Sequence, residues 1–118
     1  MQKVCDLAIN ETEADSLIWY LSEARYQSPG LVDSILARFR LMTDDVYSPL
    51  RFSMMYFLRV QSSLQQTDEL VTTLVREMKL HSLGMPYCYT AALTLLRLNL
   101  ADVVLNQMAT DYRNQCGP

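Results

Sequence analysis

The sequence contains few of the residues that form tight turns. Only three of its 118 residues are glycine and four are proline. Small domains built from β-sheet use more of both residues in their turns, so this scarcity favours helices. The three glycines stand far apart, at positions 30, 84 and 117, which excludes a glycine-rich loop that could hold a phosphate group.

Positive charge is not concentrated anywhere along the chain. The formal net charge is −3, and the arginine and lysine residues are scattered singly. Proteins that bind nucleic acids carry a basic stripe or patch, because the phosphate backbone supplies much of their affinity. The sequence therefore predicts no nucleic-acid partner.

Cysteine and histidine are too few and too scattered for a metal site. The three cysteines, Cys5, Cys88 and Cys116, are odd in number, and no CxxC or Cys/His pairing is present. This spacing supports neither a zinc site nor a disulfide framework, and the plain interpretation is reduced thiols in a cytosolic protein. We expect no metal and no other cofactor.

The sequence also lacks a catalytic constellation. His81 is the only histidine, and it stands near the predicted end of a helix, where a partly positive imidazole suits the helix dipole. No nucleophile elbow or Cys–His signature accompanies it. Asp44 and Asp45 share a turn without the spacing of a calcium-binding loop, so a solvated turn is predicted there. We expect that the protein is not an enzyme.

No stretch is apolar for long enough to cross a membrane. The N-terminal segment MQKVCDLAINETEAD has no basic region followed by a long apolar run, so it is not a signal peptide. The most apolar stretch, residues 86–108, is interrupted by Arg97, Asn99 and Asp102, whereas a membrane span needs about 20 mostly apolar residues. The sequence therefore predicts a cytoplasmic protein without a membrane span.

Capping residues mark the starts of helices. A serine or threonine before a helix accepts a hydrogen bond from a free backbone N–H, and proline fits the first helical position. The starts marked in this way are Ser28-Pro29, Ser48-Pro49, Gly84-Met85-Pro86, where the glycine also ends the preceding helix, Thr67 before Asp68 and Glu69, and Thr12 with Asp15 as a capping box.

Between these starts the apolar residues recur at helical spacing. Four predicted helices have a single apolar face: Ala14, Leu17, Ile18, Leu21 and Ala24 in about 12–26; Val32, Ile35, Leu36 and Phe39 in about 30–42; Leu70, Val71, Leu74, Val75 and Met78 in about 67–80; and Ala101, Val104, Leu105, Met108 and Tyr112 in the last. Helices at about 49–64 and 86–98 are apolar all round, which indicates that neighbours surround them. A short helix with Val4, Leu7 and Ala8 turned inward is predicted before these six.

The predicted helices form a repeat. Alternate helices start near residues 12, 48 and 86, a period of roughly 36–38 that is close to the 34 residues of a helix–turn–helix repeat. Short loops make sequential helices antiparallel, and such pairs stack. The predicted fold is all-α, with three stacked antiparallel helix pairs in a short α-solenoid and a single domain over residues 1–118. A generic helical bundle is the alternative.

The first helices of the pairs carry more large apolar side chains than a thin stack can bury. The surplus consists of Trp19, Tyr20, Phe52, Tyr56, Tyr89 and Leu93. An exposed apolar patch of that size is typical of an interaction surface, so we predict a concave groove that binds an amphipathic helix of a protein partner. A second copy of the chain would cover the same surface. For any single tyrosine, a place at the rim of the core is the simpler interpretation.

The first pair resembles the tetratricopeptide repeat. The residues at the spacing of the repeat's signature aromatic, tyrosine, loop glycine and second-helix aromatic are Trp19, Tyr26, Gly30 and Phe39. Ser22 and Glu23 occupy the usual Leu-Gly places, which is a departure. The other two pairs share the architecture of the repeat but not its signature.

Residues 10–112 resemble the small three-repeat tetratricopeptide chaperones of bacterial type III secretion needle subunits. The resemblance is carried by EADSLIWYL and LARFRLM in the first repeat and by MPYCYTAALTLLRLNLADVVLNQMA in the last. It implies a cytosolic chaperone in a hetero-oligomer, usually with a small helical co-chaperone. Such a chaperone holds the amphipathic C-terminal helix of the needle subunit in its groove and prevents premature polymerisation.

A second resemblance competes with the first. LADVVLNQM after LLRLN is similar to helix pairs in eukaryotic vesicle-coat solenoids of the epsilon-coatomer kind. Those chains are much longer, so this resemblance implies a fragment, whereas the start at Met1 and the compact length favour a whole small protein. A generic repeat adaptor that mediates protein–protein assembly is the remaining alternative.

Overall fold

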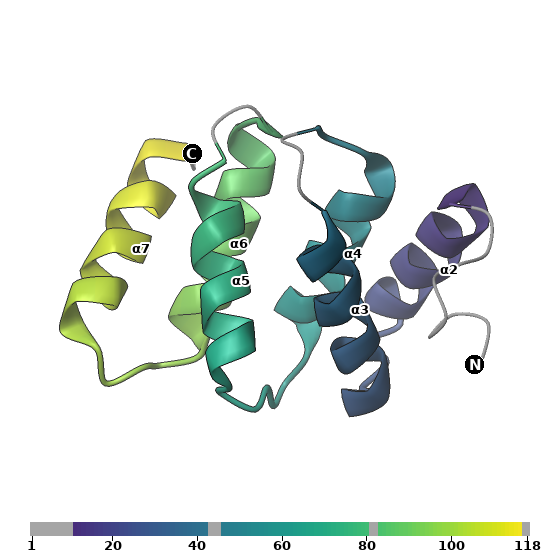
Figure 1. The fold of residues 1–118 in the computed structure, drawn as a ribbon, viewed down its shortest axis with the longest axis horizontal. Helices are drawn as coiled ribbons and strands as arrows, with labels where there is room; N and C mark the ends of the chain where they lie inside the picture. Colours follow the sequence, from purple (N-terminus) through teal and green to yellow (C-terminus); the bar gives the residue numbers. More distant parts are fainter. Residues whose placement is uncertain (1–10, 43–45, 81–82, 117–118) are drawn as a thin grey trace. The chain divides into compact units, whose positions relative to one another are not determined.

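The structure is a computed structural model, and it describes residues 11–42, 46–80 and 83–116 (Figure 1). Three predicted features lie outside the described residues: the short helix with Val4, Leu7 and Ala8, the turn at Asp44-Asp45, and His81. Over the described residues every regular element longer than one turn is an α-helix, which confirms the all-α prediction.

The described residues form six α-helices, the number predicted. They are α2 (Glu11–Glu23), α3 (Pro29–Leu41), α4 (Pro49–Val60), α5 (Asp68–Met78), α6 (Met85–Arg97) and α7 (Val103–Cys116). The chain divides into two compact units, Met1–Leu64 with α2, α3 and α4, and Gln65–Pro118 with α5, α6 and α7. The single domain stays a prediction, since units this short lie at the small end of what folds alone.

The predicted capping residues start three of these helices. In each case the side-chain oxygen of the cap residue accepts a hydrogen bond from the backbone N–H three residues on, as the cap geometry requires. The pairs are Ser28 with Leu31 at 3.1 Å, Ser48 with Arg51 at 3.1 Å and Thr67 with Leu70 at 3.2 Å. These caps fix where α3, α4 and α5 begin.

The capping box predicted at Thr12 and Asp15 is wrong. Thr12 is already the second residue of α2, and the Asp15 carboxylate instead accepts a hydrogen bond from the hydroxyl of Ser53 in α4. The acidic side chain therefore joins two helices instead of capping one. A contact with a distant part of the chain outcompeted the local one, which the spacing of two residues cannot reveal.

Two other helix ends differ from the prediction. α2 ends at Glu23, because Arg25 adopts a left-handed conformation with φ 58° and the backbone N–H of Tyr26 bonds back to the Leu21 carbonyl at 2.9 Å. Gly84 does not end α5, which stops at Met78. It is the residue before α6, and its φ of 93° with ψ of 160° is a conformation that essentially only glycine adopts.

In the first unit, α2 packs along α4 in the same direction. Asp15 accepts a hydrogen bond from Ser53, and Glu23 accepts one from Tyr56. The later residue of α2 thus contacts the later residue of α4, so the two helices run parallel. These pairs are 38 and 33 residues apart in the sequence, which brackets the predicted period. Parallel first helices at that spacing are what stacked helix pairs require.

The core face of α2 is narrower than predicted. Ala14, Ile18 and Ser22 are buried at successive four-residue steps, and the Ser22 hydroxyl donates to the Ile18 carbonyl at 2.7 Å. Leu17 is 41% exposed and Ala24 is exposed, although both belong to the predicted apolar face. A small buried serine whose hydroxyl is satisfied lets α4 approach α2 closely.

Two glutamine side chains connect the α2–α3 loop to the end of α4. Gln61 donates to the Tyr26 carbonyl at 2.8 Å and accepts from the Ser28 N–H at 3.1 Å. In return, Gln27 donates a hydrogen bond to the Val60 carbonyl at 3.2 Å and accepts one from the backbone N–H of Ser62. We call Gln27 and Gln61 the glutamine joint. It satisfies backbone groups that the two helix ends leave free.

The helices predicted to be apolar all round are the most buried ones. Eight of the 12 residues of α4 and seven of the 13 residues of α6 are buried. α3 buries one stripe, as predicted, and it includes Val32, Ile35, Leu36 and Phe39. Both Met54 and Met55 are fully buried side by side in α4, consistent with methionine as a core filler.

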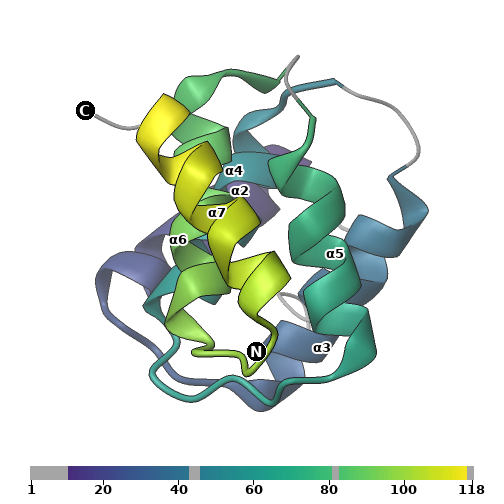
Figure 2. The ribbon, with the colours of Figure 1, turned by 90° about the vertical axis from the view of Figure 1, so that its left-hand side faces the viewer.

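In the second unit, α6 contacts both α5 and α7, and in Figure 2 α7 lies nearest the viewer. The inner face of α5 contains Leu70, Leu74 and Met78, as predicted, but it also buries Thr73 and Glu77. Val71 and Val75, which belong to the predicted stripe, are only half-buried. The buried face of α5 is thus rotated toward two polar residues.

A buried carboxylate explains that rotation. Glu77 is fully buried, and the hydroxyl of Tyr87 in α6, itself only 1% exposed, donates to its Oε1 at 2.5 Å. The guanidinium of Arg76 lies 3.3 Å from Oε2. A buried carboxylate needs such partners, because an unpaired one would lose its hydration without compensation.

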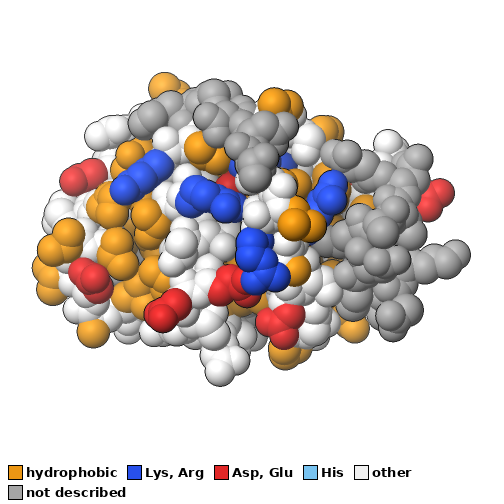
Figure 3. Space-filling view, viewed as in Figure 1, with side chains coloured by type: hydrophobic (Ala, Val, Ile, Leu, Met, Phe, Trp, Pro, Cys, Tyr) orange, Lys and Arg blue, Asp and Glu red, His pale blue; other side chains and the backbone are white. Residues whose placement is uncertain are grey.

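The apolar stripe predicted for the last helix is wrong. Ala101 precedes α7 and is exposed, Val104 is 74% exposed, and Met108 and Tyr112 are half-buried. The one buried residue of α7 is Ala109. The physical reason is that α7 packs on α6 through a small residue, so its larger side chains are left at the surface. Hydrophobic side chains are visible over α7 in Figure 3.

Candidate protein-binding surface

Two of the predicted partner-binding residues meet where α2 packs on α4. The rings of Trp19 and Tyr56 have their centroids 4.9 Å apart at an interplanar angle of 40°. The Tyr56 hydroxyl donates to Oε2 of Glu23 at 3.1 Å, which holds the ring in place from its polar end. Trp19 is 42% exposed and Tyr56 is half-buried, so the pair presents aromatic surface to solvent.

A second aromatic pair stands at the start of α4. The rings of Tyr47 and Phe52 lie 6.5 Å apart, edge to face, at 63°. Tyr47 precedes the cap residue Ser48, and Phe52 is the fourth residue of the helix. This is the arrangement of a hydrophobic staple, which fixes the angle at which the chain enters a helix. Tyr47 is 50% exposed and was not among the predicted site residues.

Trp19 of the first pair and both rings of the second pair line one surface pocket. It has a volume of about 380 Å³ and is lined by Asp15, Ser16, Trp19, Tyr47, Pro49, Phe52 and Ser53. We call Trp19, Tyr47, Phe52 and Tyr56 the aromatic patch. Tyr20, the remaining predicted residue of α2, is 65% exposed and does not line the pocket.

Two carboxylates flank the aromatic patch. Asp15, Trp19 and Glu23 follow each other at four-residue steps along α2, so they lie on one face of the helix. Asp15 lines the pocket and accepts a hydrogen bond from Ser53, whereas Glu23 accepts one from Tyr56. These two acidic side chains give the patch an acidic border.

The last two predicted residues belong to the second unit. Tyr89 and Leu93 are four residues apart in α6, so they share one face of that helix, and both are half-buried. The six predicted residues therefore divide between the two units. Trp19, Phe52 and Tyr56 come together on the first unit, and Tyr20 follows Trp19 in the same helix. Tyr89 and Leu93 form a pair on the second unit.

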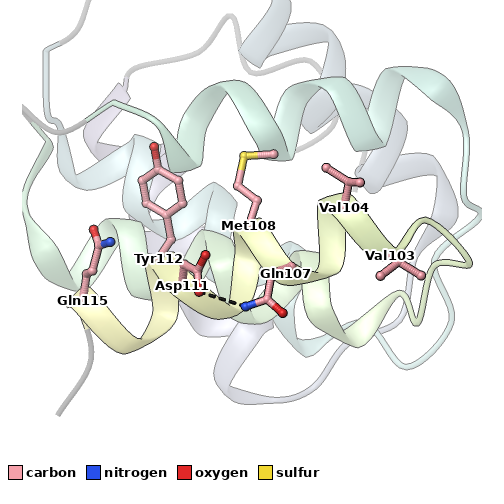
Figure 4. A pocket seen from close by; sticks show the side chains of 7 residues that line it. All are labelled: Val103, Val104, Gln107, Met108, Asp111, Tyr112 and Gln115. Atoms are coloured by element: carbon pink, nitrogen blue, oxygen red, sulfur yellow. Dashed lines mark hydrogen bonds between the residues drawn. The ribbon is translucent and has the colours of Figure 1, made fainter.

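A second exposed apolar surface runs along α7 (Figure 4). Its shallow pocket has a volume of about 760 Å³ and is lined by Val103, Val104, Gln107, Met108, Asp111, Tyr112 and Gln115. Val103 and Val104 are 77% and 74% exposed. Polar side chains border the valines, with Gln107 donating to Oδ1 of Asp111 at 3.0 Å. We call these seven residues the α7 face.

The described residues contain neither a metal-binding group nor a membrane-spanning helix. Within residues 11–42, 46–80 and 83–116, no group of three or more His, Cys, Asp or Glu side chains could hold a metal ion. Over the same residues no helix is long and apolar enough to cross a membrane. What the surfaces offer is aromatic and aliphatic area, with a few carboxylates and amides at the border.

Tyr47 was not among the predicted partner-binding residues, although a signal for its contact with Phe52 was present in the sequence. An aromatic residue just before a Ser-Pro helix start, with another at the fourth helical position, is the sequence pattern of a hydrophobic staple. Applied to Tyr47 and Phe52, that pattern would have placed the two rings together.

No protein-family model, curated protein or solved structure matches the chain.

Proposed function

We propose that the protein is a non-catalytic binding protein that holds an amphipathic helix of a partner protein against the aromatic patch. The observation that carries this proposal is the contact between the exposed Trp19 and Tyr56, of which Trp19 lines a pocket between α2 and α4. Tryptophan and tyrosine dominate the binding energy of many protein interfaces, because they bury large area at small entropic cost. An enzyme would need convergent catalytic groups, and the aromatic patch contributes none.

The acidic border defines the chemistry of the partner. Asp15 and Glu23 stand on either side of Trp19 along α2. A helix that fits has leucine-like residues on one face, to cover the rings, and lysine or arginine beside that face, to meet the carboxylates. The opposite charges align the helix along α2 and disfavour acidic competitors.

The more specific proposal is a chaperone of a type III secretion needle subunit. Such a chaperone, acting in the cytoplasm with a small co-chaperone, would mask the amphipathic helix that drives polymerisation. The helical architecture and the parallel packing of α2 on α4 support this proposal. The repeat spacing supports it as well, but any short α-solenoid shares these features.

The α7 face favours a second candidate function. In a solenoid each helix pair stacks on the next, so a terminal helix with exposed valines is suited to continue the stack. Val103 and Val104 are the most exposed large apolar residues of the second unit. On this proposal the chain is a repeat adaptor or part of a vesicle-coat solenoid, and assembly takes place through α7.

The single tryptophan provides a direct test of the first proposal. Trp19 is the only tryptophan in the chain, so its fluorescence reports on the aromatic patch alone. We expect a synthetic amphipathic helix of leucine and lysine to shift the emission to shorter wavelength, because binding removes the indole from water. A peptide of the same composition with its apolar residues scattered is the control. Equal shifts with both peptides, or none with either, would refute the proposal.

Substitutions then separate the patch from the rest of the surface. Tyr56→Asp is expected to weaken binding of the helix about 30-fold or more, as removal of a central aromatic residue does. Leu41→Ala, which alters a residue of α3 that is 72% exposed, serves as the matched control and is expected to change affinity less than about twofold. Isothermal titration calorimetry measures both.

Tyr89→Asp tests whether the second unit takes part. If the six predicted residues act together, this variant weakens binding as Tyr56→Asp does, while the helical circular dichroism spectrum is unchanged. Because Tyr89 is half-buried, a collapse of the spectrum would instead assign it to the core. Unchanged affinity with an unchanged spectrum would confine the binding site to the first unit.

A further inference from the structure

The two described cysteines lie at one end of the α6–α7 hairpin. The two helices pack against each other and are joined by the short loop 98–102, so the first turn of α6 and the last turn of α7 lie at the same end. Cys88 is the fourth residue of α6, and Cys116 is the last residue of α7. The two thiols are near enough that Cys116 contributes to the raised pKa of the Cys88 thiol, and both thiols are free.

This contact was not visible in the sequence, where the two cysteines are 28 positions apart. Closure of the hairpin brings them together. Folding thus holds the two thiols near each other, which is the first requirement of a disulfide. Most of the entropic cost of joining them is therefore met by folding.

We propose that Cys88 and Cys116 are a thiol-oxidation site, at which a reversible disulfide closes the α6–α7 hairpin. The bond joins the last turn of α7 to the first turn of α6. α7 packs along α6, and its one buried residue is Ala109. The disulfide would therefore add a covalent link between two helices that otherwise meet through packing alone.

The oxidant is a low-molecular-weight disulfide. The thiolate of Cys116 attacks one of its sulfurs, the oxidant's S–S bond breaks, and a mixed disulfide forms as one small thiolate leaves. Cys88 then gives its proton to solvent and attacks Sγ of Cys116. The Cys88–Cys116 bond forms and the second small thiolate leaves. Two protein thiols are oxidised, and one small disulfide is reduced to two thiols.

The surroundings of the two sulfurs set this order. Cys116 is half-exposed and can meet the oxidant, whereas Cys88 is only 3% exposed. Burial, the hydrogen bond with Cys116 and the charge of Cys116 raise the pKa of the Cys88 thiol to about 12. In the mixed disulfide Cys116 carries no charge, so one cause of that raised pKa disappears just before Cys88 must react.

The test uses the full chain with Cys5→Ser, so that only the two proposed thiols remain. The protein is incubated with oxidised glutathione, alkylated after unfolding and digested with trypsin. Cleavage places Cys88 in the peptide 80–97 and Cys116 in the peptide 114–118. We expect these two peptides to be joined, and to separate after treatment with dithiothreitol. The oxidised protein should melt about 5 °C or more above the reduced protein.

A second variant controls for the mechanism. Adding Cys88→Ser to Cys5→Ser is expected to stop the reaction at the mixed disulfide, so that glutathione stays on the peptide 114–118 and the melting temperature does not rise. If the Cys5→Ser protein itself ends with glutathione on Cys116 and an alkylated Cys88, the proposal is wrong. This measurement does not involve the aromatic patch, so its outcome is independent of whether the proposed function is correct.

Discussion

At the scale of single residues, the buried Glu77 side chain depends on a specific hydrogen-bond donor, Tyr87. Replacing Tyr87 with phenylalanine keeps the ring but removes the hydrogen bond to the buried Glu77 carboxylate. We expect Tyr87→Phe to lower the free energy of unfolding by about 1–3 kcal/mol, since a buried acceptor loses a donor. Urea denaturation followed by circular dichroism measures the change.

Tyr20→Phe is the matched control for that prediction. It makes the same chemical change at a tyrosine that is 65% exposed, where water replaces the lost partner. The free energy of unfolding should then change by less than about 0.5 kcal/mol. Equal effects of the two substitutions would show that the buried hydrogen bond does not contribute as argued.

Residue patterns predicted some of these details and missed others. Ser28, Ser48 and Thr67 cap helices as predicted, because a cap is a local interaction between residues three apart. Burial of Glu77 could not be predicted, because its partner Tyr87 stands on another helix. A charged residue looks like a surface residue in the sequence until the side chain that satisfies it is known.

At the scale of helices, α7 is the element whose surface differs most from expectation. Val104 is 74% exposed, whereas Ala109 is fully buried. We expect Val104→Lys to change the free energy of unfolding by less than about 0.5 kcal/mol, whereas Ala109→Leu should lower it by about 1–3 kcal/mol through overpacking. Thermal or urea unfolding of the two variants provides the comparison.

The same pair of variants tests the adaptor proposal. Sedimentation velocity should show loss of self-association or of assembly in Val104→Lys if the α7 face continues a helical stack. A large loss of stability in Val104→Lys would instead mean that the valine is buried in solution, and the α7 face would then not be a free surface.

The positions of the helices in the sequence were more predictable than which face of each helix is covered by a neighbour. All six described helices occur near the predicted ranges, because periodicity and caps are local signals. Amphipathicity identifies which side of a helix is apolar, but not whether a neighbour covers it, and Val104 illustrates the difference. The repeat pattern placed Trp19 and Tyr56 on the first helices of neighbouring pairs but did not predict their contact, and Tyr47 required attention to the residue before the helix.

At the scale of the whole molecule, charge bears on partner binding. The chain has a formal net charge of −3, and Asp15 and Glu23 border the aromatic patch. For a partner helix flanked by lysine or arginine, we expect the association rate constant to fall about threefold to tenfold between 50 mM and 500 mM salt, as screening weakens the attraction. Stopped-flow fluorescence of Trp19 measures the rate.

The control is the double variant Asp15→Asn and Glu23→Gln. Both amides can still accept the hydrogen bonds from Ser53 and Tyr56, so the packing of α2 on α4 is kept while the charges are removed. The association rate constant of this variant should be nearly independent of salt. A steep salt dependence that survives the double substitution would show that the charge steering arises elsewhere on the protein.

The glutamine joint affects how the first unit responds to changes in pH and salt concentration. Gln27 and Gln61 connect a loop to the end of α4 through uncharged amides only. Acidification cannot protonate these groups in any ordinary range, and added electrolyte has no net charge there to mask. Conditions that disrupt ion pairs therefore leave this connection intact, and the first unit keeps its loop in position over a broad span of acidity and ionic strength.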